Sequence, residues 1–159
     1  MIEGQWNAVG GPGRGEGEVR KLRRPRVLIV EDDDRVRELI ALLMRGEGFD
    51  VVELGDGIEA LNYLAYTEVY GRGSRRPDLV VADINMPNFS GLDLLQGLRG
   101  TRQPPPVMLV TGETDVEIRN EGRRLGAAAV VTKPFDIDFF LEAVEDCMGS
   151  RAPIPEPAQ

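Results

Sequence analysis

The sequence predicts an α/β fold in which a parallel five-stranded sheet has helices on both faces. Five short apolar runs alternate with five amphipathic segments between residues 26 and 149. The first run, at 27–30, is fully apolar rather than alternating, which is typical of a strand buried on both faces. The chain has 159 residues, of which 42% are hydrophobic, and this is enough for one domain with its own core.

The first two strand–helix units follow from apolar runs and glycine turns. Residues 27–30 predict a buried strand, and 49–54 predict the second strand. The helix between them has apolar residues at i, i+3, i+4 and i+7, namely Val36, Leu39, Ile40 and Leu43. Gly46 and Gly48 end that helix, and the turn at 55–57 leads into the next one.

The other three units have apolar runs at 79–82, 107–110 and 128–132. Ser90 and Asp93 resemble a capping box, which predicts the start of a helix after the third run. Asp136 is expected to cap the last helix. That helix has four apolar residues on one face, namely Ile137, Phe140, Leu141 and Val144.

Composition excludes several classes of function. The chain has no histidine, so it has no Ser-His-Asp triad, imidazole metal site or histidine general base. The single cysteine, Cys147, excludes an internal disulfide and a multi-cysteine zinc site. A net charge of −8 argues against general nucleic-acid binding. Neither a membrane span nor a secretory signal is expected, which favours a cytoplasmic location.

The two ends of the chain differ in composition from the domain at 26–149. Residues 1–25 are rich in glycine and predict a flexible leader, and 150–159 predict a proline-rich tail. A basic run at 20–26 is interpreted as a solvated lead-in, with nucleic acid or acidic lipid as the alternative contact. Residues 66–76 are interpreted as an extended helix and loop, with a docking loop as the alternative.

Groups suited to phosphate chemistry follow four of the strands. Glu31 and Asp32 follow the first strand, Asp83 the third, Thr111 the fourth and Lys133 the fifth. Ligands in such sheets bind beyond the carboxyl ends of the strands. Converging carboxylates repel one another unless a cation such as Mg²⁺ joins them, and a lysine suits phosphate. This set predicts covalent phosphorylation of a carboxylate.

Each of these residues also has a purely structural interpretation. Acidic residues after a strand often cap the next helix, which accounts for Asp33 or Asp34. Asp83 alone could be a turn residue. The sequential arrival of suitable groups at four strand ends favours the functional interpretation.

The chain resembles the receiver domain of two-component response regulators. The motifs that carry the resemblance are VLIVEDD (27–33), PDLVVADINMPNFSGL (77–92), VMLVTG (107–112) and VVTKPF (130–135). It covers about residues 26–148. It implies a flavodoxin-like, doubly wound fold with strand order 2-1-3-4-5.

The resemblance also implies roles for individual residues. Asp83 would accept a phosphoryl group from a histidine kinase or a histidine phosphotransfer protein. Asp32 and Asp83 would bind Mg²⁺ (or Mn²⁺) directly, Glu31 would do so through water, and Asn85 would add its backbone carbonyl. Thr111 and Lys133 would bind the phosphoryl oxygens, and the bond from Lys133 to Pro134 would be cis.

Two positions depart from the family pattern, and two others vary within it. Glu31 stands where aspartate is commoner, and Val130 replaces the usual aromatic switch residue. We therefore expect the signal to pass through the loop after Thr111 and the face formed by the fourth predicted helix, the fifth strand and the fifth helix. Asn85 and Glu113 resemble residues that tune the lifetime of the phosphate, with an inert, solvent-facing role as the alternative.

Only residues 150–159 follow the last helix, so we expect a stand-alone receiver without a DNA-binding domain. Its output would be contact with a target protein, with a relay intermediate or phosphate sink as the alternative. The sequence leaves open whether the chain forms a homodimer. A phosphatase of the haloacid-dehalogenase type is a disfavoured alternative, because its chemistry needs a second Asp as acid/base where this chain has Asn85, and an amide cannot transfer the proton. Another alternative is an adaptor protein that keeps the receiver fold but is not phosphorylated.

Overall fold

A computed structural model describes residues 23–70, 75–112, 114 and 116–149 of the chain. The strands are β1 (Arg26–Val30), β2 (Asp50–Leu54), β3 (Leu79–Asp83), β4 (Val107–Thr111) and β5 (Ala129–Thr132). The helices are α2 (Asp34–Gly46), α3 (Gly57–Val69), α4 (Gly91–Leu98), α5 (Val116–Arg124) and α6 (Ile137–Met148).

The five strands form one parallel sheet in the order β2-β1-β3-β4-β5. This confirms the predicted flavodoxin-like, doubly wound α/β fold. The order reverses between β1 and β3, which lie side by side although α2, β2 and α3 separate them in sequence. Their carboxyl ends therefore meet at the crevice where such sheets bind ligands.

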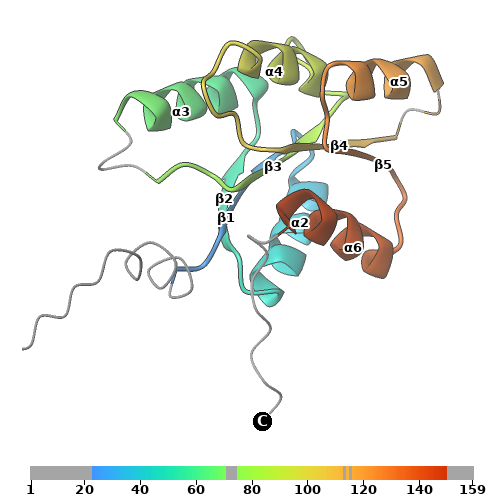
Figure 1. Cartoon of the computed structure of the whole chain (residues 1–159). Helices are drawn as coiled ribbons and strands as arrows, with labels where there is room; N and C mark the ends of the chain where they lie inside the picture. Colours follow the sequence, from blue (N-terminus) through green and yellow to red (C-terminus); the bar gives the residue numbers. More distant parts are fainter. Residues whose placement is uncertain (1–22, 71–74, 113, 115, 150–159) are drawn as a thin grey trace, which may run out of the picture.

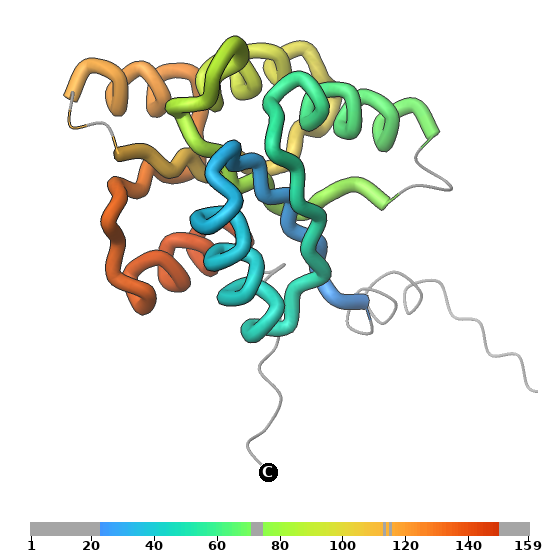
Figure 2. Tube along the Cα trace, turned by 180° about the vertical axis from the view of Figure 1, so that it is seen from behind, coloured from blue at the N-terminus to red at the C-terminus, as the bar shows by residue number. Residues whose placement is uncertain are grey.

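Helices cover both faces of the sheet (Figures 1 and 2). On one face, α2 and α6 pack over a core that includes Ile29, Ile40 and Phe140. On the other face, α3, α4 and α5 pack over a second core that includes Leu28 and Leu109. Every residue of β3 and β4 is buried, which explains why the central strands read as continuous apolar runs.

Four described helices begin at a side-chain cap. Ser90 and Asp93 form the predicted capping box of α4, and Asp136 caps α6 as predicted. Asp33 rather than Asp34 caps α2, since its carboxylate accepts hydrogen bonds from the N–H groups of residues 35 and 36. Asp56 caps α3 in the same way. These caps hold the helix N-termini at the carboxyl edge of the sheet.

Two residues expected on the apolar helix faces are half exposed. Leu39 is 49% exposed, because α2 turns Ile40, Ala41 and Met44 toward the sheet. Ile137 is also 49% exposed, because it is the first residue of α6 and the buried stripe begins at Phe140. The predicted helices are confirmed, but these two assignments to the buried face were wrong.

The expected extension of the helix into 66–76 is confirmed as far as Val69, the last residue of α3. Several expectations concern residues outside the described part, namely most of the leader at 1–25, the tail at 150–159, the loop at 71–74 and Glu113. None of the described helices has the length and apolar character needed to cross a membrane.

Candidate functional site

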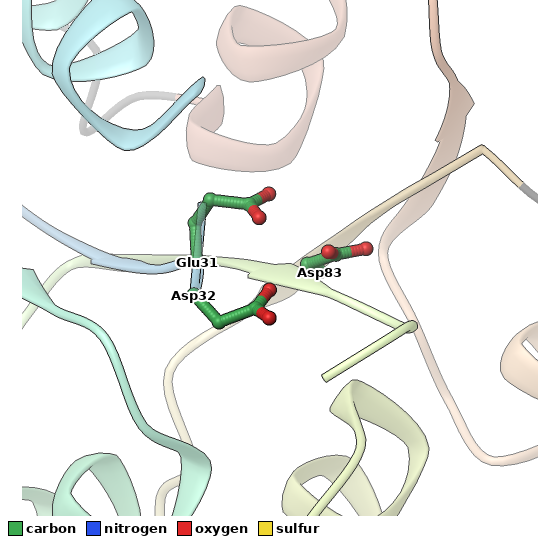
Figure 3. Close-up of side chains that lie close together, drawn as sticks. All are labelled: Glu31, Asp32 and Asp83. Atoms are coloured by element: carbon green, nitrogen blue, oxygen red, sulfur yellow. The ribbon is translucent and has the colours of Figure 1, made fainter. Parts of the chain in front are cut away.

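Three carboxylates meet at the carboxyl ends of β1 and β3. Glu31 and Asp32 directly follow β1, and Asp83 is the last residue of β3. One oxygen from each lies within 4.8 Å of the other two. Figure 3 shows Glu31 and Asp32 leaving the chain on opposite sides, with both carboxylates reaching toward Asp83. Glu31 and Asp83 are 2% and 5% exposed, whereas Asp32 is open to solvent.

Lys133 reaches the same point from the residue after β5. Its Nζ lies 2.9 Å from Glu31 Oε2 and 3.3 Å from Asp83 Oδ2. The Lys133 N–H donates to the backbone carbonyl of Thr111 at 2.7 Å, which fixes the start of the chain after β5. The peptide bond between Lys133 and Pro134 is cis. One ammonium group therefore links two nearly buried carboxylates from different strands.

The pKa values of this ion pair are shifted. Burial raises the pKa of Glu31 to about 6, with a smaller contribution from the charge of Asp83, and the hydrogen bonds from Lys133 and Asp33 only partly oppose it. Burial alone would lower the pKa of Lys133, but its contacts with Glu31 and Asp83 outweigh this and raise it. Lys133 therefore stays cationic at neutral pH, as a phosphate-binding group requires.

Asn85 and Thr111 complete the edge of the site. The Asn85 N–H donates to Asp83 Oδ1 at 3.1 Å, and its Nδ2 lies 3.4 Å from Thr111 Oγ1. Thr111, the last residue of β4, is fully buried, whereas Asn85 is exposed. The structure therefore brings Glu31, Asp32, Asp83, Asn85, Thr111 and Lys133 to one edge of the sheet.

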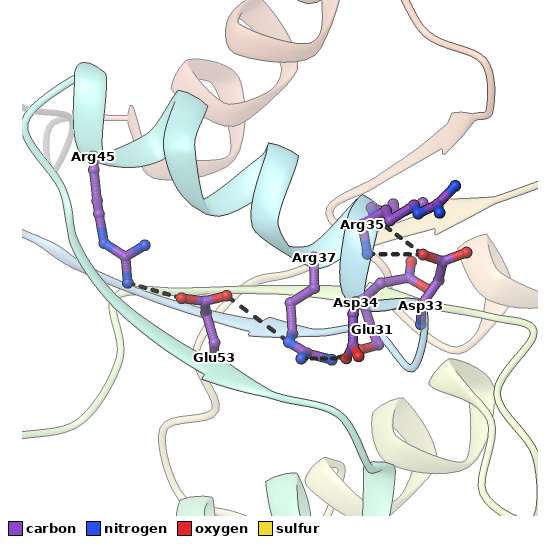
Figure 4. Close-up of polar contacts among 8 residues, drawn as sticks. Glu31, Asp33, Asp34, Arg35, Arg37, Arg45 and Glu53 are labelled. Atoms are coloured by element: carbon purple, nitrogen blue, oxygen red, sulfur yellow. Dashed lines mark hydrogen bonds and ion pairs between the residues drawn. The ribbon is translucent and has the colours of Figure 1, made fainter.

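Two supports of the acidic turn after β1 are absent from the sequence prediction. The Asp33 N–H donates to Glu31 Oε1 at 3.1 Å, in addition to the cap that its side chain provides. Arg37 Nη1 donates to the Glu31 backbone carbonyl at 2.8 Å and also pairs with Asp34 (Figure 4). The position of Arg37 one turn into α2 was the only available signal.

Gly91 is a third support that the sequence prediction missed. A Cβ at this position would lie 2.5 Å from the backbone oxygen of Asp83, which is shorter than any normal contact. Only glycine lets α4 begin this close to β3. The available signal was a glycine directly after the capping residue Ser90.

Val130, at the position where the resemblance places an aromatic switch, lies partly buried on β5 beside Leu109 of β4. Gly122 of α5 lies directly over this pair, because a Cβ there would be 2.8 Å from Leu109 Cδ1 and 3.5 Å from Val130 Cγ2. Because α5 approaches β4 and β5 this closely, the space at position 130 suits a compact side chain such as valine.

The acidic residues fit a hard divalent cation. Mg²⁺ prefers one or two carboxylates together with water and phosphate oxygens. Both oxygens of Glu31 already accept hydrogen bonds, from Asp33 and Lys133. Asp32, by contrast, is exposed, and Asp83 lies beside it. Asp32 and Asp83 are thus suited to direct binding, and Glu31 to an outer position.

Comparison with known proteins gives a consistent family assignment. Residues 27–145 match the model of the response regulator receiver domain. The chain is 40% identical over 112 residues to the DNA-binding response regulator MtrA of Mycolicibacterium smegmatis, covering 70% of this chain and 45% of MtrA. It is 35% identical over 116 residues to the response regulator MprA of Mycobacterium tuberculosis, covering 73% of this chain and 47% of MprA.

The chain therefore spans about half the length of the curated relatives that it matches. Among solved structures, a response regulator receiver protein from Burkholderia phymatum aligns with a TM-score of 0.69 and 32% identity. The alignment covers 82% of this chain and 100% of that protein. Sequence, fold and the cluster of acidic residues agree, and the chain belongs to the response regulator receiver domain family.

Proposed function

We propose that Asp83 accepts a phosphoryl group from a phosphohistidine on a histidine kinase or a histidine phosphotransfer protein. The observation that carries this proposal is the contact of Lys133 with both Glu31 and Asp83 beside the open carboxylate of Asp32. A phosphoryl group entering here would meet an ammonium group that is already held in place. The 159 residues contain no histidine, so the donor histidine would lie outside them.

The proposed transfer is a substitution at phosphorus. A carboxylate oxygen of Asp83 attacks, an O–P bond forms and the N–P bond of the phosphohistidine breaks. The imidazole nitrogen leaves with the bonding electron pair. During the transfer, Lys133 Nζ and the hydroxyl of Thr111 bind phosphoryl oxygens, which stabilises the charge that spreads over these oxygens in the transition state.

Mg²⁺ would be held by the carboxylates of Asp32 and Asp83 and the backbone carbonyl of Asn85, with Glu31 in an outer position. When bound, the ion neutralises the charge of these carboxylates and of the incoming phosphoryl oxygens. Mn²⁺ has the same preference for oxygen ligands and would serve as well. Without a cation, the carboxylates would repel the donor.

Phosphorylation would be transmitted through the face formed by α5, β5 and α6. Val116 on α5 and Phe139 on α6 are 56% and 57% exposed, so this side offers apolar contacts to a target protein. Val130 has no ring to rotate, so we propose that the loop after Thr111 carries the change. Identical amide spectra of residues 111–118 with and without a phosphate mimic would exclude this route.

A cytoplasmic target protein is the proposed output, with a second copy of the chain as another occupant of the same face. Onward transfer from Asp83 to a phosphotransfer protein would instead identify a relay, and rapid loss to water would identify a phosphate sink. Asn85 would affect that loss, because its side chain lies beside Thr111 at the edge of the site. The same role for Glu113 remains a prediction.

The proposal is tested with a small phosphodonor such as acetyl phosphate and intact-protein mass measurement. We expect a gain of one phosphoryl group that requires Mg²⁺ and is absent in Asp83→Asn. The control is Asp93→Asn, which replaces an exposed carboxylate in the cap of α4 and leaves the reaction intact. No mass gain in the wild-type protein would favour an adaptor that is not phosphorylated.

A further inference from the structure

A second charged site lies at the amino ends of the strands, at the opposite end of the sheet from Asp83. A cavity of about 420 Å³ opens beside the first residues of β2. It is lined by Arg24, Arg45, Phe49, Asp50, Val51 and Arg75. Three of the six lining residues are arginines, whereas the carboxyl edge of the sheet contributes three carboxylates.

The fold collects these arginines from three separate segments. Arg24 precedes β1, Arg45 lies in the last turn of α2, and Arg75 lies in the segment before β3. Arg26 joins two of the segments, since its Nη1 donates to the backbone carbonyl of Arg75 at 3.3 Å. Figure 2 shows the start of β1 near the turn between α2 and β2. Arg24 and Arg26 therefore meet Arg75 at one place.

Carboxylates only partly neutralise the site. Asp50 Oδ2 is shared, with Arg26 Nη2 at 2.7 Å and Arg75 Nη1 at 3.2 Å. Arg45 pairs with Glu53 at 2.9 Å (Figure 4), but its side chain is 52% exposed and can turn toward a ligand. Arg24 forms no ion pair within the described part of the chain and is exposed. Positive charge thus remains unmatched at the cavity.

The lowered pKa of Arg75 is consistent with this excess of positive charge. Its side chain is 18% exposed, and burial lowers its pKa. Repulsion from Arg23 and Arg26 lowers the pKa further, against the attraction of Asp78 and Asp50. An anion in the cavity would relieve that repulsion.

We propose that this cavity binds a small phosphate-bearing anion through Arg24, Arg45 and Arg75. Guanidinium groups match the oxygens of a phosphate with paired N–H donors. The volume lies within the range of small-molecule pockets and exceeds that of a single phosphate. Residues 27–159 carry 13 basic and 24 acidic side chains, so a long polyanion would be repelled by most of the surface. A pyrophosphate or nucleotide-sized ligand avoids that repulsion.

The site is tested by calorimetric titration of pyrophosphate and of ADP, with adenosine as the uncharged comparison. The buffer contains a chelator and little salt, so that Mg²⁺ does not direct the anions to Asp83. The test variant is Arg24→Gln/Arg45→Gln, and the matched control is Arg99→Gln, an exposed arginine at the end of α4. Amide spectra report where each ligand binds, and Asp83→Asn tests independence from the phosphoacceptor.

We expect saturable binding of pyrophosphate and ADP, amide shifts at Arg24 and Val51, and no binding of adenosine. The double variant should bind roughly tenfold more weakly or worse (about 1.4 kcal/mol or more), since it loses two charge-assisted contacts to the phosphate oxygens. Arg99→Gln and Asp83→Asn should bind normally. If the double variant unfolds, Arg24→Gln alone carries the test, because Arg24 forms no described ion pair.

Three results would overturn the proposal. The first is no binding of either phosphate by the wild-type protein. The second is equal affinity in the wild-type protein and the arginine variants. The third is binding of duplex nucleic acid or anionic vesicles without binding of small phosphates, which would show that the arginines form an extended surface instead of a pocket.

Discussion

At the carboxyl end of the sheet, Glu31 and Asp83 are nearly buried and share one ammonium group. At the amino end, Arg24 and Arg45 are exposed, and the carboxylate of Asp50 serves two arginines. The carboxyl end therefore has two nearly buried carboxylates beside the exposed Asp32, and the amino end has two exposed arginines beside Arg75, which is 18% exposed. The same strands connect both ends.

The difference shows how burial determines what a charge can do. Coulombic interactions strengthen as water is excluded, so Lys133 and its two carboxylates form a stiff unit that suits covalent chemistry. Exposed arginines keep their hydration and their freedom of movement, which suits reversible binding. Substitutions at the carboxyl end should therefore have larger effects than substitutions at the amino end.

The largest effect is expected from Lys133→Met, which keeps the length of the side chain but removes its charge. Phosphorylation of Asp83 by a small donor should slow roughly 100-fold or more, since a preorganised charge that stabilises the transition state is lost. The rate of phosphoryl incorporation measures this. Arg99→Gln, which also removes one positive charge, should react at the wild-type rate, and an equal loss in both variants would contradict a specific role.

The next effect concerns the approach of α4 to β3. Gly91→Ala places a methyl group 2.5 Å from the backbone oxygen of Asp83, so one of the two elements must move. We expect a loss of about 1–3 kcal/mol in the free energy of unfolding, measured with a chemical denaturant. Gly97→Ala is the matched change in the same helix. Its methyl group meets only the end of the Leu61 side chain, at 3.2 Å, so it should cost less than Gly91→Ala, because a side-chain end moves more easily than backbone and alanine favours helix.

A smaller effect should appear in the pH dependence of stability without Mg²⁺. The pKa of Glu31 is raised from 4.5 to about 6 in the folded protein, so the folded state binds more protons than the unfolded state between these values. The free energy of unfolding should therefore fall as pH rises through this interval, by on the order of 1–2 kcal/mol. Glu31→Gln removes the titrating group, and urea titrations across this range should show no such fall in that variant.

The smallest effect is expected at the amino end. Asp50→Asn removes the carboxylate that Arg26 and Arg75 share, but the pair is partly exposed. Its loss should reduce the free energy of unfolding by no more than about 1 kcal/mol. The same change should strengthen pyrophosphate binding several-fold, because it removes the negative charge from the cavity wall. Weaker binding would contradict the proposed role of the arginines.

Much of the fold could be predicted because most of its strands are short, continuous apolar runs; β2, which contains Asp50 and Glu53, is the exception. The residues that meet at the carboxyl edge also followed from this pattern, since parallel strands place their ends together. The exposure of Leu39 and Ile137 could not be derived, because helical spacing defines a stripe but not which part of it the sheet covers. Packing against the sheet decided both positions.

Contacts between distant segments were equally hidden. The sequence did not indicate that Arg26 meets Arg75, since the contact depends on β1 lying beside β3. Nor could it show that Lys133 binds Glu31, because that contact requires the side chain to cross from the edge strand β5 to the centre of the sheet. Which side chains meet across the sheet therefore depends on how the strands are arranged in the folded protein.

The most direct test of the central claim is to locate the phosphoryl group on the chain. After reaction with a small donor and Mg²⁺, borohydride reduction of the acyl phosphate and peptide mapping identify which carboxylate carried it. We predict modification at Asp83 alone, although Glu31 and Asp32 lie within 4.8 Å of it. Modification at Glu31 or Asp32, or at none of the three, would contradict the account.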